Sequence, residues 1–273
     1  MCSTCGCSDD AHVLLIDPTS EHRHESHQEH RHDHNHDHHH HDHDDHARDD
    51  NKRTIRLEHD LLAKNNLLAE GNRGWFAGRE ILALNLMSSP GAGKTTLLER
   101  TLRDLGAELE ISVIEGDQET ARDALRIRET GCKVVQINTG SGCHLDAQMI
   151  SDAMRSLNPA PRSIMMIENV GNLVCPALFD LGEAAKVVIM STTEGEDKPL
   201  KYPHMFRVCK LMILSKVDLL QHLQFDVDRC LEFARQVNPT LEILQVSAVT
   251  GDGLEGWYGW LRSLIAQRAT AEL

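Results

Sequence analysis

The segment from Ser88 to Thr95 has the residue types and spacing of a phosphate-binding loop. It matches the pattern Gly-x-x-x-x-Gly-Lys-[Ser/Thr], except that Ser88 stands at the first glycine. Gly91 and Gly93 allow backbone N–H groups to turn toward phosphate oxygens, and a following helix N-terminus favours anions. Lys94 can reach the β- and γ-phosphates, and the Thr95 hydroxyl can ligate Mg²⁺. The expected phosphate contacts are Gly91, Ala92, Gly93, Lys94, Thr95 and Thr96.

A glycine-containing strand-to-helix turn with an incidental Lys-Thr pair is the alternative reading of this loop. An apolar segment precedes it and a helical pattern begins at Thr95, as a nucleotide site requires. This context favours the nucleotide site.

Two later segments indicate which base is bound. Ser215-Lys216-Val217-Asp218 resembles the [Asn/Thr]-Lys-x-Asp motif that selects guanine, with Ser215 in place of the usual asparagine. The Asp218 carboxylate can accept hydrogen bonds from both the ring N–H and the amine of guanine, and the Lys216 stem can pack over the base. Ser247-Ala248 follows another apolar run and resembles the element whose backbone N–H meets guanine O6. An exposed acid at a helix start would explain Asp218 alone, but the order of the motifs favours GTP.

Two acidic residues complete the expected hydrolytic site. Asp117 and Glu168 each follow a buried apolar run, and Gly171 matches the glycine of Asp-x-x-Gly. Carboxylates in these places can bind Mg²⁺ and orient the attacking water, so Lys94 and Asp117 are the catalytic candidates. A cap on the following loop is the alternative role. No residue stands out as an arginine finger or a water-positioning glutamine, so we expect slow hydrolysis that depends on dimerisation or a partner.

Three thiols near the start of the chain predict a metal site. Cys2, Cys5 and Cys7 surround Gly6, which gives the backbone freedom to wrap one centre. If Met1 is removed, the amine of Cys2 completes a set of four donors. A square-planar arrangement suits Ni(II), and a tetrahedral one suits Zn(II).

A second metal feature is the segment from Glu21 to Asn51, in which histidine alternates with Asp and Glu. It holds every histidine except His12, His59, His144, His204 and His222. Neutral imidazoles bind borderline metals, so the tract predicts a weaker, multisite store. An engineered tag is the alternative, which the interleaved aspartates disfavour. We expect the tract to be disordered without metal.

The third candidate site is internal. Gly142-Cys143-His144 and Cys175 follow separate apolar runs, so these side chains can share one metal within a chain or across a dimer. On the residues alone, ordinary loop positions are as good an explanation. Cys132, Cys209 and Cys230 fit small core residues.

The elements that must position these residues form an alternating pattern. The expected strands are Ile81–Met87, Ile111–Ile114, Val134–Ile137, Ile164–Ile167, Val187–Met190, Leu211–Leu214 and Ile243–Val246. The expected helices are Thr95–Leu105, Glu119–Glu129, Leu145–Leu157, Phe225–Val237 and Leu254–Gln267. Unbroken apolar runs suit strands covered on both faces, so the pattern predicts a doubly wound α/β domain with a mainly parallel sheet.

Composition divides the 273 residues into an N-terminal Cys motif (1–10), a disordered His/Asp-rich tail (11–53) and a P-loop domain (54–273). An amphipathic helix through Leu57, Leu61, Leu62, Asn65 and Leu68 is expected to precede the core. The net charge of −14 disfavours nucleic acid and anionic membranes as partners. No secretory signal or membrane span is evident, and eight cysteines in such a chain indicate cytosolic thiols, so we expect a cytoplasmic protein.

Together these motifs resemble the HypB family, the hydrogenase nickel-incorporation GTPases of the SIMIBI class of P-loop proteins. The resemblance runs from Cys2-x-x-Cys5-Gly6-Cys7 through Ser88–Thr96 to the internal Cys-His and Cys-Pro segments. It implies delivery of Ni(II) to the large subunit of [NiFe] hydrogenase alongside HypA. It also implies a high-affinity nickel site at the terminal thiols, and a weaker Ni/Zn site at Cys143, His144 and Cys175 near a GTP-promoted dimer interface.

We expect nucleotide state and metal binding to be linked, because the loops of Asp117 and Glu168 adjoin those of Cys143 and Cys175. The alternatives are a nickel store, a GTPase serving urease, and a cobalamin or other metal chaperone of the same fold. The urease pattern is Cys-Pro-His and lacks the thiol-rich start, whereas here His144 directly follows Cys143.

Overall fold

The computed structural model describes residues 14–16, 46–118 and 120–271, with side chains for 59–118 and 120–268. The strands are β1 (Leu14–Ile16), β2 (Leu82–Ser88), β3 (Ile111–Asp117), β4 (Lys133–Asn138), β5 (Ile164–Glu168), β6 (Ala185–Ser191), β7 (Leu211–Ser215) and β8 (Glu242–Val246). They form an 8-stranded sheet in the order β1-β4-β3-β5-β2-β6-β7-β8. Only the pairing of β1 with β4 is antiparallel among these strands.

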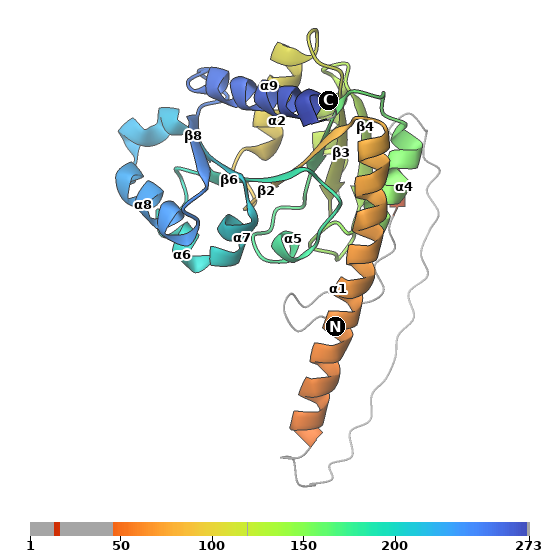
Figure 1. Cartoon of the computed structure of the whole chain (residues 1–273). Coiled ribbons are helices and arrows are strands. Elements are labelled where there is room, and N and C mark those ends of the chain that lie inside the picture. Colours follow the sequence, from red (N-terminus) through yellow and green to blue (C-terminus); the bar gives the residue numbers. More distant parts are fainter. Residues whose placement is uncertain (1–13, 17–45, 119, 272–273) are drawn as a thin grey trace, which may run out of the picture.

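Helices cover both faces of this sheet (Figure 1). The helices are α1 (His46–Gly78), α2 (Lys94–Leu105), α3 (Arg122–Arg128), α4 (Ala147–Leu157), α5 (Cys175–Leu178), α6 (Lys198–Lys201), α7 (Pro203–Val208), the 3₁₀ helix η1 (Val217–His222), α8 (Val227–Val237) and α9 (Leu254–Ala271). The predicted doubly wound α/β fold with a mainly parallel sheet is confirmed.

Each strand expected from the sequence is present, with ends that differ by at most a few residues. Some helices begin later than the sequence predicted, because a side chain stabilises the turn before them. The α3 helix begins at Arg122 because the Asp117 carboxylate accepts hydrogen bonds from Thr120 N and Oγ1 at 2.8 and 2.7 Å. Asp146 and Asp226 cap α4 and α8 in the same manner, each accepting a backbone N–H three residues ahead.

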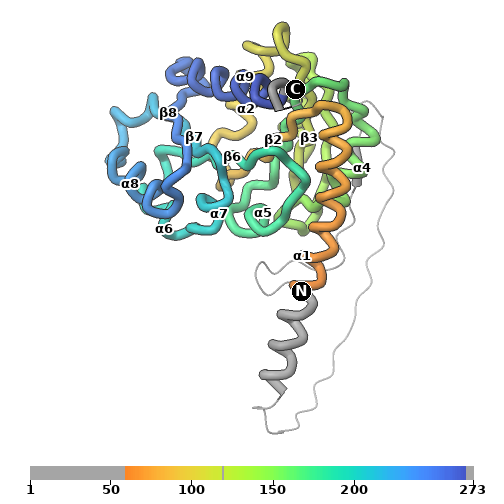
Figure 2. The backbone as a smooth tube through the Cα atoms, in the orientation of Figure 1, coloured from red at the N-terminus to blue at the C-terminus, as the bar shows by residue number. Residues whose placement is uncertain are grey.

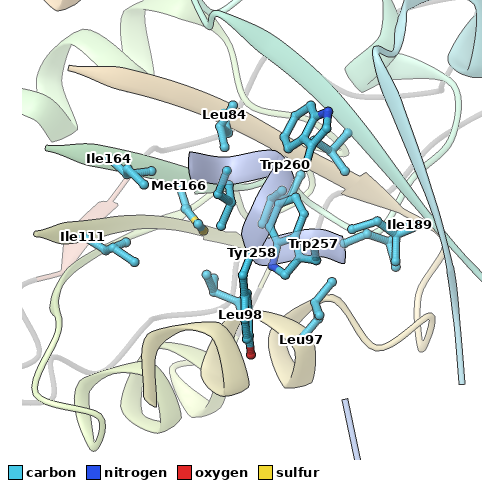
Figure 3. Packing of buried hydrophobic residues seen from close by; sticks show 14 of the residues in the cluster. Leu84, Leu97, Leu98, Ile111, Ile164, Met166, Ile189, Trp257, Tyr258 and Trp260 are labelled. Atoms are coloured by element: carbon cyan, nitrogen blue, oxygen red, sulfur yellow. The ribbon is translucent and has the colours of Figure 1, made fainter. Parts of the chain in front are cut away.

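Alternate residues of the central strands face opposite cores, as a strand's period of two requires. Helices α2 and α9 pack on one face, where Trp257 and Trp260 stack at 5.6 Å over aliphatic strand residues (Figure 3). On the other face, α1 and α4 cover one half of the sheet, and α7 and α8 cover the other. Figure 2 shows α1 beside α4 at one end of the molecule and α8 at the opposite end.

The structure differs in two places from the tail that the sequence predicted over 11–53. Leu14–Ile16 pairs with Gln136–Asn138 as an edge strand, and residues 46–53 belong to the first turns of α1. A strand of three residues is too short to show a hydrophobic period, and the polar residues 46–53 carry no apolar stripe that would indicate a helix.

Within the described residues, no helix combines the length and the apolar composition needed to cross a membrane.

Candidate nucleotide and metal sites

The predicted phosphate loop lies between the carboxyl end of β2 and the start of α2. Gly91 and Gly93 have φ angles of 75° and 93°, in the left-handed region where glycine alone is unstrained. The positive φ at both glycines gives the tight strand-to-helix turn that a phosphate-binding loop requires. Ser88 is buried at the end of β2 and is not among the described residues with positive φ, so its backbone conformation needs no glycine.

Lys94 and Thr95 converge on one carboxylate. Thr95 Oγ1 donates a hydrogen bond of 2.6 Å to Glu168 Oε1, and Lys94 Nζ lies 3.5 Å from the same oxygen. Glu168 is 2 % exposed, and burial raises its pKa while the Lys94 charge lowers it. The loop lysine, the loop threonine and the carboxylate at the end of β5 thus form one polar cluster.

Glu115 is a site residue that the sequence analysis missed. It lies on β3 opposite Glu168 on β5, and both line a cleft of about 450 Å³ with Asp117 and the phosphate loop. Burial, followed by the nearby Glu168 and Asp117 charges, raises the pKa of Glu115 to about 9. The available signal was an acidic residue inside an otherwise apolar strand.

One oxygen each of Glu115 and Glu168, Oε2 in both, is buried without a hydrogen-bond partner among the described residues. Buried carboxylate oxygens without donors are costly, and a bound cation satisfies them. Together with the Thr95 hydroxyl and Asp117 at the end of β3, they supply the hard oxygen ligands that Mg²⁺ prefers. The residues present therefore fit magnesium.

The residues predicted to recognise the base follow strands that end at the same edge of the sheet. Ser215 donates a 2.6 Å hydrogen bond to Ala92 O, and Lys216 Nζ donates a 2.7 Å bond to Gly91 O. Ser215 thus ties the β7 loop to the phosphate loop despite replacing asparagine. Lys216 has a φ of 60°, a strained conformation for a side-chain-bearing residue, and lines the cleft.

Asp218, Ser247 and Ala248 are not among the residues that line the phosphate cleft. Asp218 lies in the first turn of η1, after β7, and Ser247-Ala248 follows β8. Because Ser215 pairs with Val246 in the parallel sheet, the two loops leave neighbouring strands at the same end. A base extending from the cleft along this edge would pass between them.

The internal metal candidates come together. The ligand atoms of Cys143, His144 and Cys175 all lie within 4.8 Å of one another, although Cys175 is 32 residues beyond Cys143. The two Sγ atoms are 3.1 Å apart, and Cys143 Sγ lies 3.7 Å from His144 Nδ1. Such spacings allow three bonds of about 2.0–2.3 Å to one ion. Two sulfurs and one imidazole suit borderline metals such as Ni(II) and Zn(II).

The surroundings prepare His144 for ligation. Burial lowers its pKa, against a smaller opposing effect of Asp146, which favours the neutral imidazole that metals bind. Its ring stacks on Phe179 with centroids 3.9 Å apart and an interplanar angle of 28°. Lys186 Nζ donates a 2.8 Å hydrogen bond to Phe179 O and also contacts the carbonyls of Pro176 and Ala177, which holds the short α5 turn that begins with Cys175.

Hydrogen bonds connect the β3 side of the cleft to the Cys143 loop. Thr139 N donates to Asp117 O at 2.9 Å, and Thr139 Oγ1 donates to Gly142 O at 2.8 Å. Gln118 Nε2 also donates to Gly142 O, at 3.3 Å. The residue before Cys143 therefore rests on the end of β3.

A second route follows the segment after β5. Gly171 approaches Pro90 of the phosphate loop so closely that a Cβ would lie 3.1 Å from it. The next residue, Asn172, donates a 3.2 Å bond to Cys143 O. The same short segment thus contacts the phosphate loop and the metal-ligand loop, and it continues to Cys175.

The terminal thiols Cys2, Cys5 and Cys7 lie outside the described residues, as does the His/Asp tract up to residue 45. Cys209 and Cys230 are buried core residues, and Cys132 is partly buried against the core, in line with the sequence expectation.

The chain is similar to known proteins in sequence and in fold. Residues 82–245 match the model of the CobW/HypB/UreG nucleotide-binding domain. The hydrogenase maturation factors HypB of Rhizobium leguminosarum bv. viciae and Escherichia coli K12 are each 58 % identical to the chain, covering 80 % and 78 % of it and 73 % of the relative. The crystal structure of HypB from Helicobacter pylori in complex with nickel superposes with a TM-score of 0.70 at 38 % identity, covering 75 % of this chain and 96 % of that one. HypB from Archaeoglobus fulgidus gives the same TM-score at 40 % identity, covering 74 % and 99 %.

Proposed function

Because this chain belongs to the HypB family of hydrogenase maturation factors, we propose that it is a nickel metallochaperone that hydrolyses GTP to support nickel insertion into [NiFe] hydrogenase. The observation that carries this proposal is the position of the Cys143–His144–Cys175 cluster. It lies on loops that contact the phosphate cleft, so one molecule combines a borderline-metal site with a nucleotide switch.

The nucleotide in this proposal is GTP. The loop from Gly91 to Thr95 binds its phosphates, and Asp218, Lys216 and Ser247-Ala248 recognise guanine at the adjoining edge. Bound Mg²⁺ would supply positive charge to the β- and γ-phosphate oxygens. Of the chain's own groups, Lys94 binds the γ-phosphate. Thr95, Asp117 and Glu168 would hold the cation, and Asp117 also orients the attacking water.

Nickel is the cargo. In this proposal Cys2, Cys5 and Cys7 form the high-affinity Ni(II) site, and the His/Asp tract is a weaker reservoir. The internal site holds Ni(II) or Zn(II) through Cys143, His144 and Cys175. The crystal structure of HypB from Helicobacter pylori is of a complex with nickel, which supports nickel as the metal.

The contacts between cleft and cluster support a switch. In this proposal Asp117 and Glu168 interact with the γ-phosphate and its cation. The segments that follow these two residues contact the Cys143 loop. A change in the position of either segment on hydrolysis alters the spacing of the metal ligands. Metal affinity therefore differs between the GTP- and GDP-bound states.

The proposed partners are a second copy of the chain, a HypA-type nickel protein and the precursor of the hydrogenase large subunit. Val174 and Leu178, on either side of Cys175, are each 38 % exposed although apolar, which supports a GTP-dependent homodimer that covers the internal metal site. A relative from Helicobacter hepaticus, 40 % identical over 203 residues, is named a hydrogenase/urease maturation factor, so urease is the second client to test.

The test is nickel transfer in a purified system. Nickel-loaded protein, GTP, a HypA-type protein and the hydrogenase precursor are combined, and nickel in the precursor is measured. We expect Lys94→Ala to lower the GTP-dependent transfer by at least about a hundredfold, because a key phosphate contact is lost. Lys133→Ala, at an exposed lysine at the start of β4, is the matched control and should transfer normally.

Two results would count against this function: transfer that is indifferent to GTP, or a protein that retains no nickel once its thiols are reduced. Deleting residues 21–50 distinguishes a chaperone from a store. A chaperone lacking the tract still matures hydrogenase at ample nickel, whereas a store loses its role. Apo-urease in place of the hydrogenase precursor tests the second client.

A further inference from the structure

Two buried asparagines of α1 each join the same two loops. Asn65 Nδ2 donates a 2.8 Å hydrogen bond to Asp180 O, and its Oδ1 accepts a 2.9 Å bond from Ala147 N. Asn72, two turns further along the helix, donates from Nδ2 to Ala147 O at 2.8 Å and to Leu181 O at 3.1 Å. The two amides therefore form a double bridge between residue 147 and residues 180–181.

These two loops carry the internal metal ligands. Ala147 begins α4, three residues after His144, and Asp180 follows Phe179, the residue whose ring stacks on His144. Cys175 lies five residues before Asp180, in the α5 turn. The bridge thus connects the segment that follows Cys143 and His144 with the segment that follows Cys175.

The asparagines are placed for this contact. They are 5 % and 4 % exposed, on the face of α1 that packs against the domain, where an apolar residue is the ordinary choice. An amide in such a place costs free energy unless its donors and acceptors are satisfied, and here each carries two hydrogen bonds to backbone. The Oδ1 of Asn65 also satisfies one of the free N–H groups at the start of α4.

Further contacts fix α1 against the second loop. Arg73 Nη2 lies 2.5 Å from Asp180 Oδ2, and Arg73 Nη1 donates to Glu183 O at 3.2 Å. Gly182 has a φ of 89°, and a Cβ there would lie 2.6 Å from Ala69 O, so backbone meets backbone directly. Ion pair, hydrogen bond and backbone contact therefore fasten α1 to the loop after α5.

We propose that Asn65 and Asn72 are positioning residues of the metal site formed by Cys143, His144 and Cys175, and that α1 holds the two ligand loops at binding distance. The inference rests on the proposed metal-binding role of that cluster. Without the bridge, the free chain spends time with the loops apart, and the cost of bringing them together is subtracted from the binding free energy. The ligands are unchanged, so the coordination is the same once the site is filled.

The experiment measures Ni(II) affinity at the internal site of the full chain. The parent protein carries Cys2→Ala, Cys5→Ala and Cys7→Ala and so lacks the terminal thiol site. A weak chelator is added to compete with the His/Asp tract for Ni(II). Affinity is read from the thiolate-to-nickel charge-transfer band. We expect Asn65→Ala and Asn72→Leu each to weaken binding by about tenfold, in keeping with one or two lost hydrogen bonds. At saturating nickel both asparagine variants should show the same charge-transfer band as the parent.

Two controls separate positioning from loss of stability. Asn66→Ala changes the neighbouring exposed asparagine and should bind nickel as the parent does. Leu261→Ala opens a cavity in α9 on the opposite face of the sheet. It lowers the free energy of unfolding without touching either loop, so it should leave nickel affinity unchanged at temperatures where the protein is folded.

The outcomes are distinct. If the parent holds no nickel at this cluster, while Cys143→Ser and Cys175→Ser behave like it, the proposed metal role fails and the inference fails with it. If the parent binds nickel and both asparagine variants bind it equally well, the inference alone is wrong. A loss of affinity in Leu261→Ala as large as in Asn72→Leu would likewise reduce the asparagines to a general structural role.

Discussion

Glu115 is a buried acid whose unfavourable environment indicates a functional site. A carboxyl group 3 % exposed within a strand, beside two other acids, is unfavourable for folding. Glu168, its register partner on the neighbouring strand β5, carries the same cost, which Lys94 and Thr95 relieve in part. Unfavourable buried acids are concentrated at functional sites, because the cation and substrate that they serve restore the balance.

This cost predicts a pH dependence of stability in the nucleotide- and metal-free protein. The pKa of Glu115 rises from 4.5 to about 9 on folding, so the folded protein retains a proton that the unfolded chain releases. The associated stability is complete below the lower value and is lost as pH rises through the higher one. Between about pH 6 and pH 8, thermal unfolding of Glu115→Gln should therefore shift less than that of the wild type. Glu80→Gln, at an exposed acid, is the control, and parallel curves for wild type and Glu115→Gln would contradict the assignment.

At the level of elements, short loops and turns place most of the site. The strands deliver Asp117, Glu168 and the phosphate loop to one edge, but the proposed metal ligands lie in the turn before α4 and in α5, a helix of four residues. So short an element cannot hold its own shape. It is held by Lys186, whose ammonium group contacts three carbonyls of the segment, and by the loop that α1 clamps.

The closest backbone approach in that clamp gives a stability prediction. Gly182→Ala places a methyl group against Ala69 O in a left-handed conformation, so it should lower the free energy of unfolding by about 1–3 kcal/mol. Gly74→Ala is the matched control within α1. Its added Cβ meets nothing within 4 Å, and it should raise stability by about 0.5–1 kcal/mol through helix propensity. Chemical denaturation measures both; equal effects would mean that α1 does not pack on this loop as described.

Across the molecule, strand order determines which sites can communicate. From the central β2 the chain winds to β3 and β4 on one side of the sheet and returns to β5 beside β2. It then continues to β6, β7 and β8 on the other side. The phosphate loop after β2 therefore lies where the direction of winding changes. The loops after β3, β4 and β5 then open at one edge and contact one another. The proposed nucleotide and metal sites therefore contact the same loops but use different ligand residues.

Removing one shared contact should uncouple the two sites. Asn172→Ala deletes the hydrogen bond to Cys143 O, beside the point where Gly171 meets the phosphate loop. In the wild type we expect nickel affinity at the internal site to differ on the order of tenfold between GDP and a non-hydrolysable GTP analogue. In Asn172→Ala this ratio should approach one, while GTP hydrolysis in the absence of nickel persists. Titration of the metal in both nucleotide states decides the matter, and a ratio equal to that of the wild type would rule out this route.

Much of this protein could be inferred from local sequence. The strands appear as apolar runs because both faces of the sheet are covered, and the phosphate loop is legible because its chemistry needs contiguous residues. Asp117, Glu168 and Lys216 followed from their positions after strands. These features depend on neighbours within a few residues, which periodicity and spacing describe well.

Contacts between distant segments were beyond that reach. The pairing of Glu115 with Glu168 and the bridging by Asn65 and Asn72 depend on which strands are adjacent and how closely loops approach. The sequence allowed Cys143 and Cys175 to share one metal within a chain or across a dimer, and only the structure brings them together within one chain. Asn65 was part of the predicted amphipathic helix with several leucines, but the local sequence did not indicate its hydrogen-bond partners. A hydrophobic pattern specifies that a face is buried, whereas packing in three dimensions specifies against what.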